Sequence, residues 1–504
     1  MHYSLGIDAG GTYTDAVLVR DSDGEIIDSN KALTTYPDPL AGIKNVVDGL
    51  NPGYLENVKL VSVSTTLSTN TILEGTGFPV ALILIGDHPL EKELPTGHVL
   101  FARGGHNHNG EEVFPLELEA IEKFALSVKD KVSAFAISSY FSTRNPEHEL
   151  EARDSILKLT GLPAVCGHEL SQELGAYERA VTAFLNAQLI PITRQFVQSI
   201  ITDIRIRGIN AQLLMLKCDG SVVGIKDALQ KPIETIFSGP AASLVGASYL
   251  SGLKTCAVVD VGGTSTDISS ICMGVPDLSD EGAVVGGWKT RIRAIRMETT
   301  ATGGDSHIWT VNRELFLGPR RVIPLAVAAV KYQGFLNNLK RTPMPSREDL
   351  GENIQPTKFF VRSGYPAGEL SKAEAEVRGA IGEEPVSVHE IKTLLRKDLH
   401  PQTLDSLIKK RLVQAIGFTP TDALHVLGNY TAWNEEASRI GAERLARLMR
   451  MAPGEFCTAV KKKVARNMAL HLLSYILQGV PYTAIEKILD GNYCLRNLIM
   501  VHNI

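Results

Sequence analysis

Short runs of apolar residues alternate with amphipathic stretches along the N-terminal part of the chain. The runs at residues 80–85 and 134–140 are small or apolar at nearly every position, a pattern typical of parallel strands buried on both faces. Helical spacing of apolar residues predicts helices at 147–159, 177–189 and 192–206. This alternation of strands and helices predicts an α/β fold.

A second set of elements follows. Strands are predicted at 212–217 and 257–260, and a helix rich in small residues runs from Ser238 to about residue 250. After about residue 340, charged amphipathic helices dominate, and they are predicted at 372–380, 388–396, 402–414, 435–449 and 456–477. We therefore predict a first half at 1–191, a second half at 192–335, and a mainly helical C-terminal module at 336–504.

One eight-residue motif occurs twice. The segment Asp8–Asp15 (DAGGTYTD) returns 252 residues later (260 − 8) as Asp260–Asp267 (DVGGTSTD), with six of the eight positions identical. Each copy lies between two apolar, β-prone runs, so both copies are predicted as strand, Gly-rich turn and strand. An ordinary hairpin turn would explain one copy, but the repetition favours two related halves with a shared function.

The composition of the repeated turn points to phosphate binding. Paired glycines let backbone N–H groups approach an anion, and neighbouring hydroxyls add further donors. The aspartate that leads each copy, Asp8 and Asp260, is suited to hold a hydrated Mg²⁺ that bridges phosphates. The predicted phosphate-binding residues are Gly10, Gly11, Thr12, Thr14, Gly262, Gly263, Thr264 and Ser265. No P-loop motif is present, and strands rather than helices follow the glycines, so a dinucleotide fingerprint is not supported.

Two further segments are candidates for lining the same site. A hydroxyl-rich run at 64–70 follows a predicted strand, and it offers Thr65, Thr66 and Asn70 to a cleft, although helix capping would account for one or two of its hydroxyls. Ser238 and Gly239 open the small-residue helix, which suits either anion binding or close helix–sheet packing.

Three histidine-containing segments can be interpreted as functional or as structural. The Gly-rich segment 302–307 places Asp305 near His307, which predicts an acid–base pair, while a plain turn is the alternative. The loop at 104–110 holds two alternating histidines, His106 and His108, which suit a metal ion, a substrate contact or simple solvation. Asp422 and His425 lie one helical turn apart after an N-capping Thr-Pro pair, and we interpret them as structural.

Composition narrows the class of protein. The 504 residues carry 51 basic and 56 acidic side chains, a net charge of −5, which favours neither nucleic acid nor an anionic membrane. The longest apolar run, 80–85, is far too short to span a bilayer, and the N-terminus shows no signal peptide. Six scattered cysteines without a Cys-x-x-Cys motif predict a reduced, cytoplasmic protein.

The motifs together resemble the hydantoinase A / 5-oxoprolinase family, which includes N-methylhydantoinase and the related acetone carboxylase subunits. The matching segments are 6–15, 64–70, 238–240, 260–267, 303–304 and 419–428. The resemblance implies a member of the actin-like ATPase superfamily, with two ribonuclease-H-like halves around a nucleotide cleft. Family members also carry a Gly-rich adenosine loop near the C-terminus. The sequence shows no such loop from Pro481 onward, so we expect the adenosine side of the cleft to be incomplete.

The resemblance also implies a reaction, the ATP-dependent opening of a cyclic amide of the hydantoin or 5-oxoproline type. Phosphorylation of the amide oxygen would activate the carbonyl carbon toward water, with Asp8 and Asp260 positioning Mg²⁺-ATP. A hydantoinase B-like second subunit is a partner of many members, and a homo-oligomer is a further expectation. Two alternatives remain open at this point: an activating subunit of an acetone-carboxylase-like complex, and a non-catalytic nucleotide-binding subunit.

Overall fold

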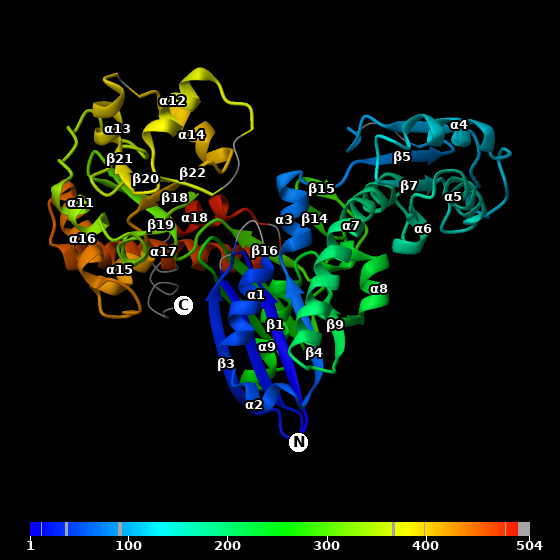
Figure 1. Ribbon diagram of the computed structural model, residues 1–504, viewed down its shortest axis with the longest axis horizontal. Helices are drawn as coiled ribbons and strands as arrows, with labels where there is room; N and C mark the ends of the chain where they lie inside the picture. The colour runs from blue at the N-terminus through cyan, green and yellow to red at the C-terminus, as the bar shows by residue number, and fades with distance from the viewer. Residues whose placement is uncertain are drawn as a thin grey trace. The chain divides into compact units, whose positions relative to one another are not determined.

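The computed structural model describes residues 1–11, 13–35, 39–88, 93–364, 368–397, 399–478 and 480–491. It contains two compact units (Figure 1). Unit 1 comprises Met1–Val258 and Ser269–Arg296, and unit 2 comprises Val259–Ile268 and Met297–Ile504. The second copy of the repeated motif thus belongs to unit 2, whereas the first belongs to unit 1. The predicted boundaries between the first half, the second half and the C-terminal module, at 191/192 and 335/336, stay predictions.

A six-stranded mixed sheet forms the base of unit 1, in the order β10-β9-β4-β1-β2-β3. Strands β1 (Tyr3–Ala9), β2 (Tyr13–Arg20) and β3 (Ile26–Leu33) are antiparallel, whereas β4 (Val58–Thr65) runs parallel to both β1 and β9 (Gln212–Leu216). Every second residue of β1 is buried, because alternate side chains of a strand point to opposite faces. Helix α1 (Pro39–Asp48) packs against this sheet, and the short strand β10 (Val222–Gly224) closes its other edge.

The predicted strands at 80–85 and 134–140 lie in a second, fully parallel sheet of unit 1. Its order is β6-β5-β7-β8, formed by Val99–Ala102, Val80–Ile85, Ala134–Ser139 and Ala164–Cys166. All six residues of β5 and of β7 are buried. Alternate residues pack on α4 (Leu118–Val128) and α5 (Glu147–Thr160) on one face, and on α7 (Ala176–Ile206) on the other (Figure 1). Burial on both faces confirms the predicted pattern.

Helix α7 corrects one prediction. The two helices expected at 177–189 and 192–206 form a single 31-residue helix with Pro191 inside it. Proline removes one backbone hydrogen bond and disfavours a helix interior. Here the residues on both sides, Leu189, Ile190 and Thr193, are buried, so tertiary packing holds the helix together across the proline.

Unit 1 has further helices and strands outside these two sheets. They are α2 (Pro52–Leu55), α3 (Leu67–Glu74), α6 (Gly167–Leu170), α8 (Ile225–Gln230), a 3₁₀ turn (Pro232–Thr235), α9 (Ser238–Ser251), β13 (Val275–Pro276), β14 (Val284–Val285) and β15 (Trp288–Lys289). Strands β11 (Cys256–Val261) and β12 (Thr266–Cys272) each begin in one unit and end in the other.

Unit 2 combines helices with a four-stranded sheet in the order β19-β22-β20-β21. Its strands are β16 (Met297–Thr300), β17 (Ser306–Val311), β18 (Glu314–Arg321), β19 (Ile323–Pro324), β20 (Phe359–Arg362), β21 (Val386–Ser387) and β22 (Val413–Gly417). Its helices are α10 (Leu325–Lys331), α11 (Phe335–Arg341), α12 (Lys372–Ala380), α13 (Val388–Leu395), α14 (Pro401–Lys409), α15 (Pro420–Val426), α16 (Glu435–Met449), α17 (Pro453–Ile476) and α18 (Tyr482–Gly491).

The helix predicted at 402–414 is wrong at its C-terminal end. Helix α14 stops at Lys409, Arg411 adopts a left-handed backbone conformation (φ 57°), and Val413 begins β22. A left-handed residue ends a helix because it reverses the chain direction. None of the described helices of either unit is long and apolar enough to cross a membrane.

Candidate functional site

The first Gly-rich turn joins β1 to β2 in unit 1. Asp8 pairs in register with Asp15, and the backbone N–H of Gly10 donates to the carbonyl of Tyr13 at 3.1 Å. A Cβ atom at Gly10 would lie 2.8 Å from that carbonyl oxygen, so the turn requires glycine there. Thr12 lies outside the described residues.

Asp8 sits where three predicted segments meet within unit 1. In the parallel pairing of β1 and β4 it lies opposite Ser64, whose hydroxyl donates to Asp8 Oδ1. A Cβ atom at Gly239, in the first turn of α9, would lie only 3.8 Å from the same oxygen. Ser64 opens the predicted run at 64–70, but its contact with Asp8 could not be predicted, because the strand pairing that aligns the two residues is not visible in one sequence.

The hydroxyl run and the start of α9 are linked to this turn. Thr66 donates its backbone N–H (3.1 Å) and its hydroxyl (3.3 Å) to the carbonyl of Ala9, and Asn70 Nδ2 donates to Thr66 Oγ1 at 3.3 Å. The Ser238 hydroxyl lies 3.2 Å from both the backbone N and the carbonyl O of Thr65. The structure therefore gathers Thr65, Thr66, Asn70, Ser238 and Gly239 near Asp8, and their cofactor-binding role stays a prediction.

Thr14 has a clear structural contact. Its buried hydroxyl lies 3.0 Å from that of Thr34, which in turn donates to the carbonyl of Gly10 at 2.8 Å. The hydroxyl of Thr14 thus helps to fix the turn, and its predicted contact with phosphate is left to experiment.

The second Gly-rich turn, in unit 2, has the same local geometry. The backbone N–H of Gly262 donates to the carbonyl of Ser265 at 2.9 Å, the bond that Gly10 makes to Tyr13 in the first copy. Thr266, the counterpart of Thr14, is likewise fully buried, and it donates to the carbonyl of Thr302 at 2.6 Å. Thr264 is exposed and Gly263 is half-buried, so the tip of this turn is open to a ligand.

The third Gly-rich segment packs directly on the second turn. Gly304 donates its N–H to the carbonyl of Gly262 (2.9 Å), and Asp305 donates to that of Gly263 (2.7 Å). A Cβ atom at Gly303 would lie 2.6 and 2.7 Å from these two carbonyl oxygens. Thr421 then donates its N–H and its hydroxyl to the carbonyl of Gly304 at 3.0 and 2.8 Å. Three motifs far apart in the sequence thus form one cluster in unit 2.

Asp305 and His307 have different partners. Asp305 Oδ2 accepts from Arg321 Nε at 3.3 Å, and burial, opposed by Arg321, raises the pKa of this carboxyl to about 6. His307 is fully buried, and burial holds its pKa well below the ordinary value. Its Nδ1 lies 3.4 Å from Nζ of Lys358, whose pKa burial lowers to about 7. A carboxyl that titrates near neutrality suits acid–base work, but the pairing of Asp305 with His307 stays a prediction.

Asp422 and His425, both in α15, make contacts that support this cluster of unit 2. The buried Asp422 carboxylate accepts hydrogen bonds from two residues of α10, two donors of Thr419 and the hydroxyl of Ser438. Thr419 forms the predicted cap of α15 with Pro420 at its start. His425 lies 2.8 Å from the carbonyl of Thr421 and accepts from the N–H of Trp433 at 3.1 Å. These contacts agree with the structural interpretation of both residues.

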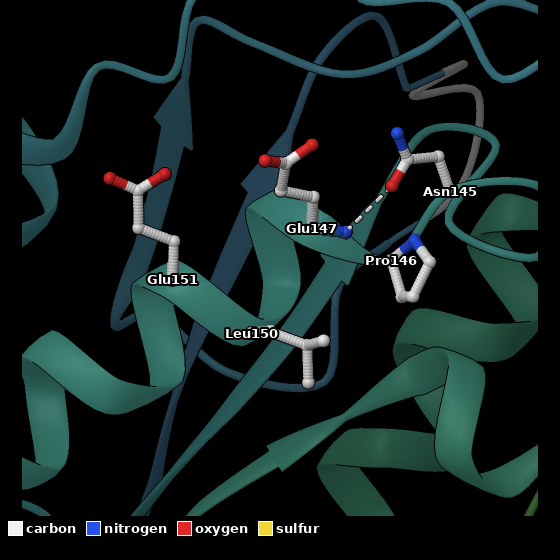
Figure 2. Close-up of a pocket in the computed structure, with 5 residues that line it drawn as sticks. All are labelled: Asn145, Pro146, Glu147, Leu150 and Glu151. Carbon is white, nitrogen blue, oxygen red and sulfur yellow. Dashed lines mark hydrogen bonds between the residues drawn. The ribbon is translucent and has the colours of Figure 1, made fainter.

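The alternating histidines of the loop at 104–110 do not converge. His106 is buried and its ring lies 4.4 Å from that of His148, whereas His108 is exposed. A separate open pocket lies in the same parallel-sheet region at the start of α5 (Figure 2). It is lined by Asn145, Pro146, Glu147, Leu150 and Glu151, and Asn145 Oδ1 accepts from the N–H of Glu147 at 3.0 Å.

The fold and the repeated turns define a mixed α/β protein with parallel sheets. Two solved structures share this fold: nucleotide-free acetone carboxylase (TM-score 0.61, 18% identity) and the ATP-dependent caprolactamase from Pseudomonas jessenii (TM-score 0.61, 20% identity). Each likeness covers 94% of this chain and 63% of the other.

The chain belongs to the hydantoinase/oxoprolinase family. The model of the family's N-terminal region matches residues 4–160, and the hydantoinase/oxoprolinase model matches residues 179–332. This confirms the predicted family.

Three relatives illustrate the range of the family. The acetophenone carboxylase gamma subunit of Aromatoleum aromaticum is 27% identical over 83% of this chain and 62% of its own length. The caprolactamase subunit alpha of Pseudomonas jessenii is 27% identical over 60% of this chain and 48% of its own length. The 5-oxoprolinase 1 of Arabidopsis thaliana is 24% identical over 64% of this chain and 29% of its own length. The chain spans 62% or less of the length of each of these relatives.

Proposed function

We propose that the chain acts in the ATP-dependent opening of a cyclic amide of the hydantoin or 5-oxoproline type. The observation that carries the proposal is the duplicated turn. Gly10 and Gly262 make the same backbone hydrogen bond, and an aspartate stands two residues before each of them. Relatives described as an ATP-dependent caprolactamase and as 5-oxoprolinase support this reaction class.

The residues of each turn fit a magnesium–polyphosphate. Gly10 has no room for a Cβ, and Gly303 presses its backbone against the second turn in the same way, so a ligand at either turn would meet main chain rather than glycine-position side chains. We assign phosphate contacts to the main-chain N–H groups of Gly11 and Gly263, with Thr264 as a further donor. Gly10 and Gly262, whose N–H groups bond to the carbonyls of Tyr13 and Ser265, would shape the two turns. Asp8 and Asp260 would hold Mg²⁺ through water, since this cation keeps most of its waters and takes few carboxylates. Bound Mg²⁺ would neutralise phosphate charge.

The proposed reaction consumes one ATP and two waters. The terminal phosphoryl group passes to the amide oxygen, which releases ADP and leaves an imidate phosphate. Water adds to the carbon, the C–N bond breaks with the amine as leaving group, and a second water releases phosphate from the resulting acyl phosphate. Asp305 suits the proton transfers, because its carboxyl titrates near neutrality.

The sheet order of unit 1 supports the ribonuclease-H-like part of the prediction. Three antiparallel strands, β1 to β3, continue on the other side of β1 into the parallel strands β4 and β9. We propose that this sheet is one half of an actin-like ATPase fold and that unit 2 contributes the second phosphate turn.

A second candidate function has its own support. The alignment to the acetophenone carboxylase gamma subunit covers 83% of this chain, so ATP-dependent activation of a ketone or bicarbonate within a carboxylase complex is the alternative. Three relatives are described as subunits, and under either function we propose that a second, hydantoinase B-like subunit completes the enzyme.

Phosphate release distinguishes the two functions. Purified chain with Mg²⁺-ATP is assayed against hydantoin, 5-oxoproline and caprolactam, and separately against ketones with bicarbonate, with and without a co-expressed second subunit. Release that requires a cyclic amide supports the first function, and release that requires ketone and bicarbonate supports the second. ATP binding without turnover in any combination contradicts both and leaves a nucleotide-binding subunit.

A further inference from the structure

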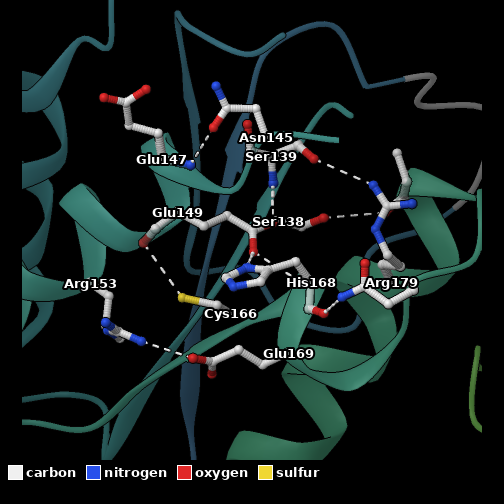
Figure 3. A network of polar contacts seen from close by, with 12 residues as sticks. Ser138, Ser139, Asn145, Glu147, Glu149, Arg153, Cys166, His168, Glu169 and Arg179 are labelled. Atoms are coloured by element: carbon white, nitrogen blue, oxygen red, sulfur yellow. Dashed lines mark hydrogen bonds and ion pairs between the residues drawn. The ribbon is translucent and has the colours of Figure 1, made fainter. Parts of the chain in front are cut away.

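A cluster of metal-ligating side chains lies at the carboxyl ends of β7 and β8, in the parallel sheet of unit 1 (Figure 3). It consists of Glu149 on α5, Cys166 at the last position of β8 and His168 in α6. Each offers one ligand atom, and the three atoms all lie within 4.8 Å of one another. In open parallel sheets, the carboxyl ends of the strands are where ligands bind.

The carboxylate of Glu149 is held in a fixed orientation. It is completely buried, Oε1 accepts from the backbone N–H of Ser139 at 2.7 Å, and Oε2 accepts from that of His168 at 3.0 Å. His168 Nδ1 lies 2.5 Å from Oε2. Main-chain donors thus hold the carboxylate against the imidazole, which is the role that outer hydrogen bonds play around metal ligands.

Cys166 completes the set from the adjacent strand. Its thiol is buried and donates to the main-chain carbonyl of Glu149 at 3.4 Å. A carboxylate and a thiolate together carry two negative charges, which a divalent ion would balance in this buried position.

We propose that Glu149, Cys166 and His168 bind one zinc ion through Oε2, Sγ and Nδ1. Binding requires the 2.5 Å contact between Oε2 and Nδ1 to open, because two ligands about 2.0–2.1 Å from a tetrahedral zinc lie farther apart than this. A set of one sulfur, one nitrogen and one oxygen favours zinc over Mg²⁺ or Ca²⁺, which take oxygen ligands. The His168 side chain is 14% exposed while that of Glu149 is 0% exposed, so a fourth ligand, water, enters on the His168 side. Three protein ligands plus water is the arrangement of reactive zinc sites.

Proton balance gives the proposal a second observable. Zinc replaces the thiol proton of Cys166, which is released to solvent. Zinc also binds His168 at Nδ1. A neutral imidazole then carries its single proton on Nε2, so the imidazole itself releases no proton. Binding to the neutral-imidazole form therefore releases one proton per zinc ion. The site is independent of the proposed ATP chemistry, because none of its residues belongs to the Gly-rich turns.

The test measures metal binding by the whole chain without any activity assay. Protein loaded with zinc and dialysed is analysed for metal content, and cobalt-loaded protein is examined for the thiolate charge-transfer band and the visible bands of four-coordinate Co²⁺. We expect one zinc per chain, loss of the charge-transfer band in Cys166→Ser, and at least tenfold weaker binding in His168→Gln. Cys218→Ser, which removes another buried thiol of unit 1, is the matched control and keeps the wild-type spectrum.

Several outcomes would overturn the proposal. Folded wild-type chain that retains no zinc after loading shows that the three groups form a hydrogen-bond network only. If Cys166→Ser fails to fold, His168→Gln decides the question, because its partly exposed position makes it the variant expected to fold. Wild-type zinc affinity in His168→Gln would also mean that the three groups form a hydrogen-bond network only. Calorimetry in two buffers of different ionisation enthalpy must also show one proton released per zinc ion. Release of no proton would contradict binding through the thiolate.

Discussion

Gly304 donates its backbone N–H to the carbonyl of Gly262 at 2.9 Å, which fastens the third Gly-rich segment to the second copy of the repeated turn. The contact leaves no space for a side chain at the preceding residue, Gly303. The shape of the second turn therefore depends on a segment that lies about 40 residues further along the chain.

Substitution of Gly303 is expected to disturb this contact. In Gly303→Ala the new Cβ would lie 2.6 Å from the carbonyl oxygen of Gly262, and such overpacking costs about 1–3 kcal/mol. Urea unfolding should show this loss, and calorimetry should show weaker ATP binding. Gly351→Ala, where an added Cβ meets nothing within 4 Å, is the control. Equal stability of the two variants would mean that the packing of the loop on the turn is unimportant.

The leading aspartates are expected to matter more than the trailing ones. Asp8→Asn should lower substrate-dependent phosphate release at least about 100-fold, the scale on which removal of one group that stabilises charge acts, with circular dichroism unchanged. Asp260→Asn should behave alike. Asp15→Asn is the matched control, since Asp15 pairs with Asp8 across the hairpin and contacts only the exposed Lys31 at 2.9 Å among the interactions described here. Activity retained in both Asp8→Asn and Asp260→Asn would refute the magnesium assignment.

Arg321 is expected to tune the acidity of Asp305. Burial raises the pKa of Asp305 to about 6, and the guanidinium of Arg321 opposes the rise. Arg321→Gln should therefore raise the pKa further, and the limb of the pH–rate profile near pH 6 should move to higher pH by up to about one unit. The profile of phosphate release measures this shift. If the limb near pH 6 stays in place in Arg321→Gln, or persists in Asp305→Asn, a group other than Asp305 is responsible for that limb.

Lys358 predicts a pH dependence of stability. Burial lowers its pKa to about 7 from 10.5. Between these values the unfolded chain binds a proton that the folded chain does not, so the free energy of unfolding rises with pH, by up to about 1.4 kcal/mol per pH unit. Urea unfolding between about pH 7.5 and 9.5 should show this slope in the wild type and lose it in Lys358→Met. Parallel curves for the two proteins would show that Lys358 stays charged in the fold.

Much of the local structure follows from the sequence. The buried strands β5 and β7, the capped helix α15 and the two strand–turn–strand motifs are predicted correctly, because apolar periodicity, capping residues and glycine pairs act over a few neighbouring residues. The family was also predicted from these motifs. The continuity of α7 through Pro191 was not predicted, because the buried contacts on both sides of the proline, which outweigh its cost in a helix, are not visible in the sequence.

The sequence by itself determined the duplicated Asp-Gly-Gly turn and the residue types on which the proposed polyphosphate contacts rest. Only the tertiary structure decided which groups surround each turn. Ser64 meets Asp8 through parallel strand pairing, and Lys358 lies beside His307 although 51 residues separate them in the chain. Glu149, Cys166 and His168 likewise meet only where a helix packs on the ends of two strands. Such contacts arise from long-range packing, for which the periodicity of a single chain carries no signal.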